Sequence, residues 1–296
     1  MVRFGKIYFS YHHDGNGRSG HALKNLFTSV ILAEIMAGRT VFNETWRTQN
    51  ILPESGVRRI LLDVDRAKCA EFEFRHHKKQ WEGISYDEFR RFVAWVLERR
   101  KRFRNTLIEL RGIFRIHLSQ VYVWEIENKL KSGTHRSIVK TLRKMYWDSE
   151  AAPTTHWPPR TIAIHARRGD VANPEHKLYA TRGPGSVWNC AFYQSCVDSL
   201  KLEFPDSEII VYSENEWVGD LKQLSKVTLK LGGPEDLSSH IRAMLSADLF
   251  IPSDSGLSVW IAHLSEARIR VYQGNQICHF YSYSDKMPSN FESITL

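Results

Sequence analysis

Strand-like and helix-like segments alternate along the second half of the chain, and this alternation restricts the fold more than any other feature of the sequence. The strand-like segments are Thr161–His165, Glu208–Tyr212, Val227–Leu231, Asp248–Pro252 and Ile269–Tyr272. The helix-like segments between them lie near Trp188–Leu200, Asp236–Leu245 and Leu257–Leu264. Short apolar strands separated by helices are typical of a parallel sheet with helices on both faces. We therefore expect an α/β fold.

The beginning of the chain shows a shorter version of the same pattern. Residues Lys6–Tyr11 are strand-like, a glycine-rich turn follows at 12–20, and apolar residues recur at helical spacing from Ala22 to Ile31. A second strand-like run at Arg39–Asn43 completes the pattern of a βαβ unit.

The middle of the chain is more helical. Ser85 and Glu88 have the spacing of a capping box, which predicts that a helix begins there. The basic stretch Glu98–Arg115 is interpreted as the solvated face of a helix, and residues 116–146 also have a helical pattern.

A polar, proline-rich segment at 151–159 predicts a domain boundary. We expect an N-terminal α/β domain with a helical middle at residues 1–152 and a C-terminal Rossmann-like domain at residues 153–296. The two halves are expected to face each other across a cleft.

The chain is basic, because 41 Lys and Arg residues against 33 Asp and Glu residues give a formal net charge of +8. A basic protein can bind nucleic acid or a smaller polyanion such as a nucleoside diphosphate. No helix-turn-helix and no basic sheet motif with interleaved aromatic residues is evident. We therefore expect no nucleic-acid partner. A basic protein that binds nucleic acid through the helix predicted at Glu98–Arg115 is the weaker alternative.

Three further features predict the compartment. No apolar run approaches the roughly 18 residues that span a bilayer. The first residues do not resemble a secretory signal, and the four cysteines form no Cys-x-x-Cys pair. We expect a cytoplasmic protein with reduced thiols and no membrane span, from a bacterium or a virus-infected host cell. The oligomeric state stays open.

The first loop that is suited to phosphate binding directly follows the strand-like segment Thr161–His165. Its sequence is His165-Ala-Arg-Arg-Gly-Asp170, with Arg167 and Arg168 at its centre. Ligands bind beyond the carboxyl ends of the strands in such sheets, and a guanidinium group can donate two hydrogen bonds to a phosphate at once. A surface ion-pair cluster is the alternative interpretation.

The second loop contains Gly15, Asn16, Gly17 and Arg18 and precedes a predicted helix. Glycines allow backbone N–H groups to approach a phosphate at the start of a helix. An ordinary turn between a strand and a helix explains the same residues.

The third loop contains Ser253, Asp254, Ser255 and Gly256 and opens the predicted helix that follows Asp248–Pro252. Its hydroxyl groups can cap that helix. They can equally donate to a phosphate, which the helix dipole favours at this end.

Together, these loops resemble those of the fucosyltransferase superfamily, whose members make α1,2-, α1,6- and protein O-linked fucose. The segment from His165 to Asp170 looks like the family's donor-binding motif. Residues 245–260 resemble its later motif, and Gly15–Gly20 resembles its N-terminal glycine loop. Residues 45–155 carry no such resemblance.

The resemblance implies a GT-B fold and an inverting glycosyltransferase that needs no metal and no cofactor. Its substrates would be a nucleotide-sugar donor, above all GDP-fucose, and a glycan acceptor. The N-terminal domain would lie on the acceptor side, and the C-terminal domain would bind the donor.

The resemblance also implies roles for individual residues. Arg167 would grip the donor β-phosphate, and His165 would lie near the nucleotide. The other expected donor contacts are Gly15, Asn16, Gly17, Arg18, Arg168, His240, Ser253, Asp254, Ser255 and Gly256. Transfer also needs a carboxylate that takes the proton of the acceptor hydroxyl. We expect this carboxylate to be Glu175, with Asp170 as the alternative.

One departure from the family pattern leaves the donor open. Many relatives carry an aspartate that reads the guanine edge at the position where this chain has His240. Asp236 or Asp254 can take that role instead. A different donor, carrying rhamnose, xylose or another sugar, is therefore the alternative prediction.

Overall fold

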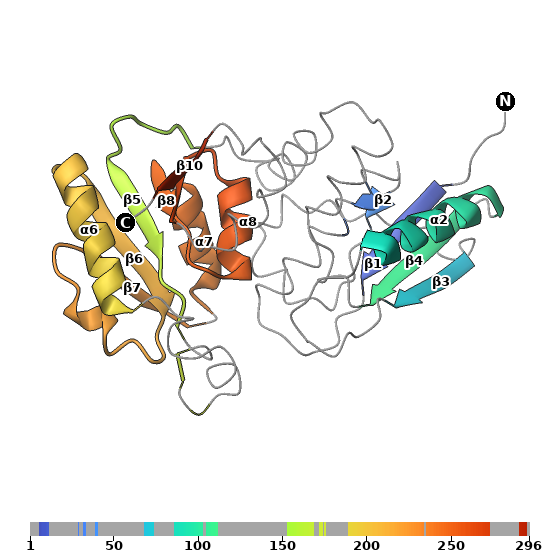
Figure 1. Ribbon diagram of the computed structural model, residues 1–296, viewed down its shortest axis with the longest axis horizontal. Coiled ribbons are helices and arrows are strands. Elements are labelled where there is room, and N and C mark those ends of the chain that lie inside the picture. The colour runs from blue at the N-terminus through green and yellow to red at the C-terminus, as the bar shows by residue number, and fades with distance from the viewer. Residues whose placement is uncertain are drawn as a thin grey trace. The chain divides into compact units, whose positions relative to one another are not determined.

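The computed structural model describes residues 6–11, 29, 32–33, 39–40, 68–73, 86–102, 105–111, 153–168, 172–173, 175, 189–233, 235–272 and 290–294 (Figure 1). The chain divides into two compact units, Met1–Ser149 and Glu150–Leu296. Each unit is described by itself.

The C-terminal unit is built on a six-stranded sheet in which every described strand pair is parallel. The strands are β5 (Thr161–His165), β6 (Glu208–Glu214), β7 (Thr228–Gly232), β8 (Leu249–Ile251), β9 (Arg268–Tyr272) and β10 (Phe291–Ile294). Their spatial order is β10-β9-β8-β5-β6-β7. The chain therefore starts in the centre at β5, runs to one edge through β6 and β7, and returns to the other side of β5 at β8.

This order is the doubly-wound Rossmann order, in which the direction of winding reverses between the first and fourth strands. In the present sheet those strands are β5 and β8, which pair directly, with Ala163 opposite Phe250. The expected parallel α/β sheet is confirmed, and β5 has the predicted bounds. The expectation that two such halves face each other across a cleft stays a prediction.

Helices connect the strands and cover the sheet. They are α6 (Cys190–Glu203), α7 (Leu237–Leu245) and α8 (Gly256–Leu264), with a short 3-10 helix η6 (Leu221–Gln223) after β6. Ile164, Val211 and Ile251 on the sheet form one buried cluster with Val197 and Leu200 of α6. Burying a side chain of this kind stabilises a fold by about 1.5–3 kcal/mol.

The segment before β5 is attached to the amino end of the sheet by one buried carboxylate. Asp248 accepts hydrogen bonds from the backbone N–H groups of His156 at 2.6 Å, Arg160 at 2.9 Å and Thr161 at 3.0 Å. Next to it, the guanidinium carbon of Arg268 lies 3.5 Å from the ring centroid of Trp157. The segment is therefore held by both polar and cation–π contacts.

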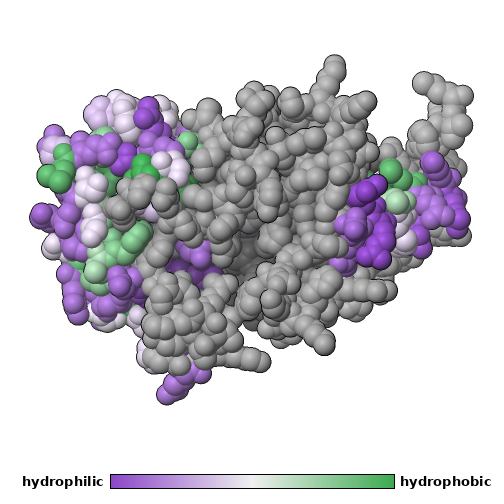
Figure 2. Space-filling model, viewed as in Figure 1, coloured by the Kyte–Doolittle hydropathy of each residue, from purple (hydrophilic) through white to green (hydrophobic). Residues whose placement is uncertain are grey.

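The N-terminal unit contains a four-stranded parallel sheet with the order β2-β1-β4-β3. The strands are β1 (Lys6–Tyr11), β2 (Arg39–Thr40), β3 (Lys68–Glu73) and β4 (Asn105–Arg111). The helix α2 (Tyr86–Arg102) begins next to the predicted capping box and buries Phe89, Phe92, Val93 and Val96. Its exposed side chains are mostly hydrophilic (Figure 2).

The interpretation of Glu98–Arg115 as one helix face is wrong. The helix ends at Arg102, and Asn105–Arg111 forms β4, which pairs with both β1 and β3. The reason is that the stretch contains apolar residues that a central strand can bury, and Ile108 is fully buried. This removes the continuous basic helix on which the nucleic-acid hypothesis depended. The predicted helical region at 116–146 lies outside the described residues.

Candidate functional site

The loops after β5 and β8 meet at the point where the winding of the C-terminal sheet reverses. His165, the last residue of β5, is buried with its Nδ1 atom 2.5 Å from the Oγ atom of Ser258 and 3.0 Å from that of Ser253. The Oγ atom of Ser253 lies 3.2 Å from that of Ser255. The structure therefore brings together three expected residues, His165, Ser253 and Ser255, and adds Ser258.

The local sequence explains why the loop after β8 takes this shape. Ser255 has extended backbone angles, and its Oγ atom accepts the Ser258 N–H at 3.1 Å, so Ser255 is the N-cap of α8. The Ser253 N–H donates to the Oγ atom of Ser258 at 2.9 Å. Gly256 is the first residue of the helix, and both it and Asp254 are partly exposed. The N-terminus of α8, with its positive end of the helix dipole, thus begins beside His165.

The imidazole of His165 is neutral at neutral pH. Burial, the largest cause, and the charges of Arg167 and His240 together lower its pKa from 6.5 to about 3. A neutral imidazole has one nitrogen that donates and one that accepts a hydrogen bond. The ring can therefore bind polar groups without adding a charge to the site.

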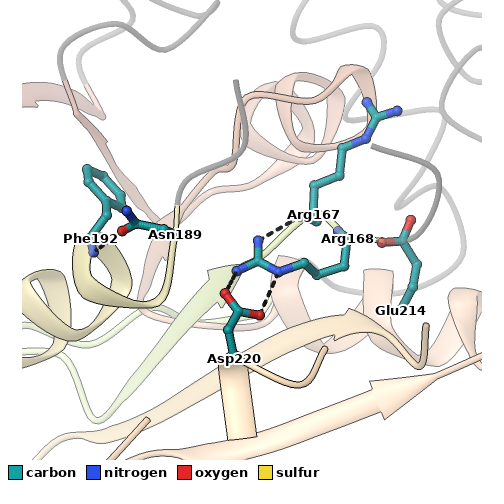
Figure 3. A network of polar contacts seen from close by, with 6 residues as sticks. All are labelled: Arg167, Arg168, Asn189, Phe192, Glu214 and Asp220. Carbon is teal, nitrogen blue, oxygen red and sulfur yellow. Dashed lines mark hydrogen bonds and ion pairs between the residues drawn. The ribbon is translucent and has the colours of Figure 1, made fainter. Parts of the chain in front are cut away.

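Arg167 and Arg168 are adjacent in the sequence but point in different directions (Figure 3). The Arg168 guanidinium is buried and donates to Asp220 through Nη2 at 2.7 Å and through Nε at 3.3 Å. Its Nη1 atom donates to the carbonyl oxygen of Arg167 at 3.0 Å. Arg167 is partly exposed and extends away from this network (Figure 3). The geometry thus places Arg168 in the support of the loop. Its expected contact with the nucleotide stays a prediction.

Two acidic residues, one at the end of β6 and one in the loop after it, belong to the same arrangement, and the sequence did not predict either. Glu214, the last residue of β6, accepts the backbone N–H of Arg168 at 2.8 Å through Oε2. Asp220 holds the Arg168 guanidinium from the other end of the same loop. Its position in the sequence could have identified Glu214. An acidic residue at the end of the second strand is typical of nucleotide-binding sheets of this order.

His240 lies at the neighbouring strand end. Its ring packs edge-on against Tyr212, with the ring centroids 5.2 Å apart. Burial lowers the pKa of His240 and Lys230 lowers it further, whereas Asp236 acts against this shift. Asp236 accepts the Gly233 N–H at 3.0 Å through Oδ2. The base-reading role of His240 or Asp236 stays a prediction.

Several predicted residues cannot be placed. Gly15, Asn16, Gly17, Arg18 and Asp170 lie outside the described residues. Glu175 is described and exposed, and its backbone N–H donates to the Oδ1 atom of Asn173 at 2.9 Å. Its expected role as the proton acceptor stays a prediction.

The absence of a metal also stays a prediction. Within the part of the chain that the structure describes, no group of three or more His, Cys, Asp or Glu side chains could hold a metal ion. An Asp-x-Asp triplet at Asp63–Asp65 lies outside that part. Among the described helices, none is long and apolar enough to cross a membrane.

The comparisons with known proteins identify no family. No protein-family model matches the chain, and no curated protein matches it. The chain is similar to the solved structure of the family 9 glycosyl transferase from Veillonella parvula DSM 2008, with a TM-score of 0.47 and 11% identity over 99% of this chain and 86% of that chain. It is also similar to the E. coli heptosyltransferase WaaC with ADP, with a TM-score of 0.44 and 10% identity over 98% and 93% of the two chains. Both TM-scores are below 0.5, so these similarities carry no argument about donor or reaction. They do not show the fucosyltransferase superfamily.

Proposed function

We propose that the C-terminal unit binds the nucleoside diphosphate of a sugar donor at the carboxyl ends of β5 and β8, and that the protein is a glycosyltransferase. The observation that carries the proposal is the meeting of His165 with the serine cluster of Ser253, Ser255 and Ser258 at the reversal point of the sheet. In open α/β sheets, this point is where ligands bind.

The chemistry of the surrounding groups fits a diphosphate. The N-terminus of α8 favours negative charge, because its first N–H groups have no partner within the helix. Arg167 extends from the adjacent loop and can donate two parallel hydrogen bonds to phosphate oxygens. The neutral ring of His165 adds hydrogen bonding without competing for that charge.

The proposed reaction is a single displacement at the anomeric carbon. The bond from that carbon to the diphosphate oxygen breaks, and a bond from the acceptor hydroxyl oxygen to the same carbon forms. The hydroxyl proton passes to a carboxylate, for which Glu175 and Asp170 are the candidates. Arg167 stabilises the negative charge that develops on the departing diphosphate.

Two donors are proposed. The sequence motifs favour GDP-fucose. The alternative, a different nucleotide sugar, rests on the departure at His240. Asp236 and Asp254 are the candidates for the guanine-reading role, and Asp236 already accepts the Gly233 N–H through Oδ2.

A thermal-shift experiment tests the site and the donor together. The full chain is heated with GDP, UDP, dTDP or ADP, once with EDTA and once with Mg²⁺, because a ligand that binds only the folded state raises its melting temperature. We expect a shift with one nucleotide, and a much smaller shift for Arg167→Ala. The matched control is Arg268→Ala, which removes an arginine at the amino end of the sheet and leaves the shift unchanged. No shift with any nucleotide, or equal shifts in the two variants, would refute the proposed site.

A further inference from the structure

The loop after β6 carries an aromatic side chain in a backbone conformation that such residues avoid. Trp217 has a φ angle of 56°, and its side chain is 49% exposed. A positive φ is uncommon outside glycine, and a bulky residue that adopts it is a genuine outlier. The ring does not fill the core, because it is half exposed. Such outliers concentrate at ligand-binding sites, where the surrounding structure enforces them.

The loop is fixed on both sides of Trp217. Before it, Glu214 accepts the Arg168 N–H, and the Asn215 N–H donates to the Gly232 carbonyl oxygen at 3.2 Å. After it, Val218 is buried and Asp220 binds the Arg168 guanidinium. Glu214 and Asp220, three residues before and three residues after Trp217, thus both contact Arg168 (Figure 3). The loop therefore holds Trp217 in place at the carboxyl edge of the sheet.

The position of this loop indicates which part of a nucleotide it would meet. In sheets of this order, the phosphates lie at the reversal point, and the ribose lies at the end of the second strand. The second strand is β6, so the nucleobase would lie beyond its end, beside the loop at 215–220. A planar base stacks on an aromatic ring without regard to its hydrogen-bonding pattern.

We propose that Trp217 is the platform on which the nucleobase of the donor stacks. This inference rests on the proposed function, since it requires that a nucleotide binds at the ends of β5 and β8. It assigns base affinity to one side chain that contacts neither the phosphates nor the reacting sugar.

The test compares a nucleotide with inorganic pyrophosphate, which has no base. Dissociation constants are measured by calorimetry for the full chain with whichever of GDP, UDP, dTDP and ADP binds it most tightly, and for pyrophosphate. The variants are Trp217→Ala, Trp217→Phe and Trp217→Gly. The glycine variant also removes the unfavourable backbone conformation, so its melting temperature is expected not to fall. The control is Trp157→Ala, which removes a similarly exposed indole, 47% exposed, from the amino end of the sheet.

We expect Trp217→Ala and Trp217→Gly to weaken nucleotide binding about tenfold or more, as stacking on an aromatic ring predicts. Trp217→Phe should retain most of the affinity, and pyrophosphate binding should change less than about twofold in every variant. The Trp157→Ala control should bind both ligands like the parent. Equal nucleotide affinity in Trp217→Ala and the parent overturns the inference and leaves the proposed function intact. An equal loss of pyrophosphate binding also overturns it. A parent chain that binds no nucleotide overturns both.

Discussion

The carboxylate of Asp248 offers a sharp test of how the C-terminal unit is held together. It is buried and accepts three backbone N–H groups, from His156, Arg160 and Thr161, that lie 92, 88 and 87 residues earlier in the chain. Replacing Asp248 with alanine removes all three hydrogen bonds at once. The side chains that pack around the sheet are otherwise unchanged.

The magnitude follows from what each N–H group can do after the substitution. A hydrogen bond to a charged group contributes about 1.5–3 kcal/mol. His156 and Arg160 are exposed, so water can replace the carboxylate at their amides, whereas Thr161 is the first, half-buried residue of β5. We therefore expect Asp248→Ala to lower the free energy of unfolding by about 3–4 kcal/mol. That is a large share of the about 5–15 kcal/mol that keeps a typical protein folded.

Two further variants make the measurement specific. Asp248→Asn retains one acceptor oxygen, which can serve Arg160 and Thr161 while its amide group faces the His156 N–H, so the loss should be about half as large. Asp206→Ala removes an exposed aspartate from the same unit and should change the free energy by less than about 0.5 kcal/mol.

The assays are denaturant unfolding and hydrogen exchange of the backbone amides of His156, Arg160 and Thr161. In Asp248→Ala these three amides should exchange faster even where the rest of the unit is protected. If Asp248→Ala and Asp206→Ala unfold alike, or if exchange at 156–161 is unchanged, the carboxylate does not hold this segment and the reasoning fails.

Two other predictions concern the site. The pKa of His165 is lowered from its ordinary value of 6.5 to about 3, so the unfolded chain binds more protons than the folded chain between these values. Stability should therefore fall as the pH drops below 6.5, by up to about 1.4 kcal/mol per pH unit, and His165→Gln should flatten this slope in melting curves from pH 7 to 4. Gly232→Ala should lower the free energy of unfolding by about 1–3 kcal/mol, because the added Cβ would lie 2.5 Å from His240 Cε1 and 2.7 Å from Asp236 Cβ. In the control Gly219→Ala the added Cβ meets no atom within 4 Å, and equal denaturation midpoints in the two variants would contradict the close approach.

The strands of the C-terminal sheet other than β10 could be predicted because they are short runs rich in apolar residues between turn residues. β5 carries the sequence Thr-Ile-Ala-Ile-His and is buried over four of its five residues, as expected for a central parallel strand. β10 carries Phe-Glu-Ser-Ile and lies at the edge of the sheet, where two polar residues hide the pattern. β4 was missed because a basic helix end precedes it directly, and the apolar spacing of the two elements runs together.

The candidate site was predictable only as far as topology brings strand ends together. The meeting of His165 with Ser253 follows from the pairing of β5 with β8, because His165 ends β5 and Ser253 lies two residues after the end of β8. The contact between Arg168 and Asp220 spans 52 residues and joins a loop to a loop. No period or motif in the sequence predicts it, because it depends on where the turn after β6 places one carboxylate.

The two arginines show most clearly what the fold adds to the motif. Arg167 and Arg168 carry the same side chain, so the sequence assigns both to a phosphate. Only Arg168 has its guanidinium buried against Asp220, and the side chain of Arg167 points in a different direction (Figure 3). An arginine that is held by a carboxylate on one side and by a carbonyl on the other has fewer donors left for a phosphate. It fixes the loops after β5 and β6 to each other, and these loops carry Arg167 and Trp217. We therefore expect Asp220→Ala to reduce the thermal shift that a nucleotide gives, because the two loops lose this connection.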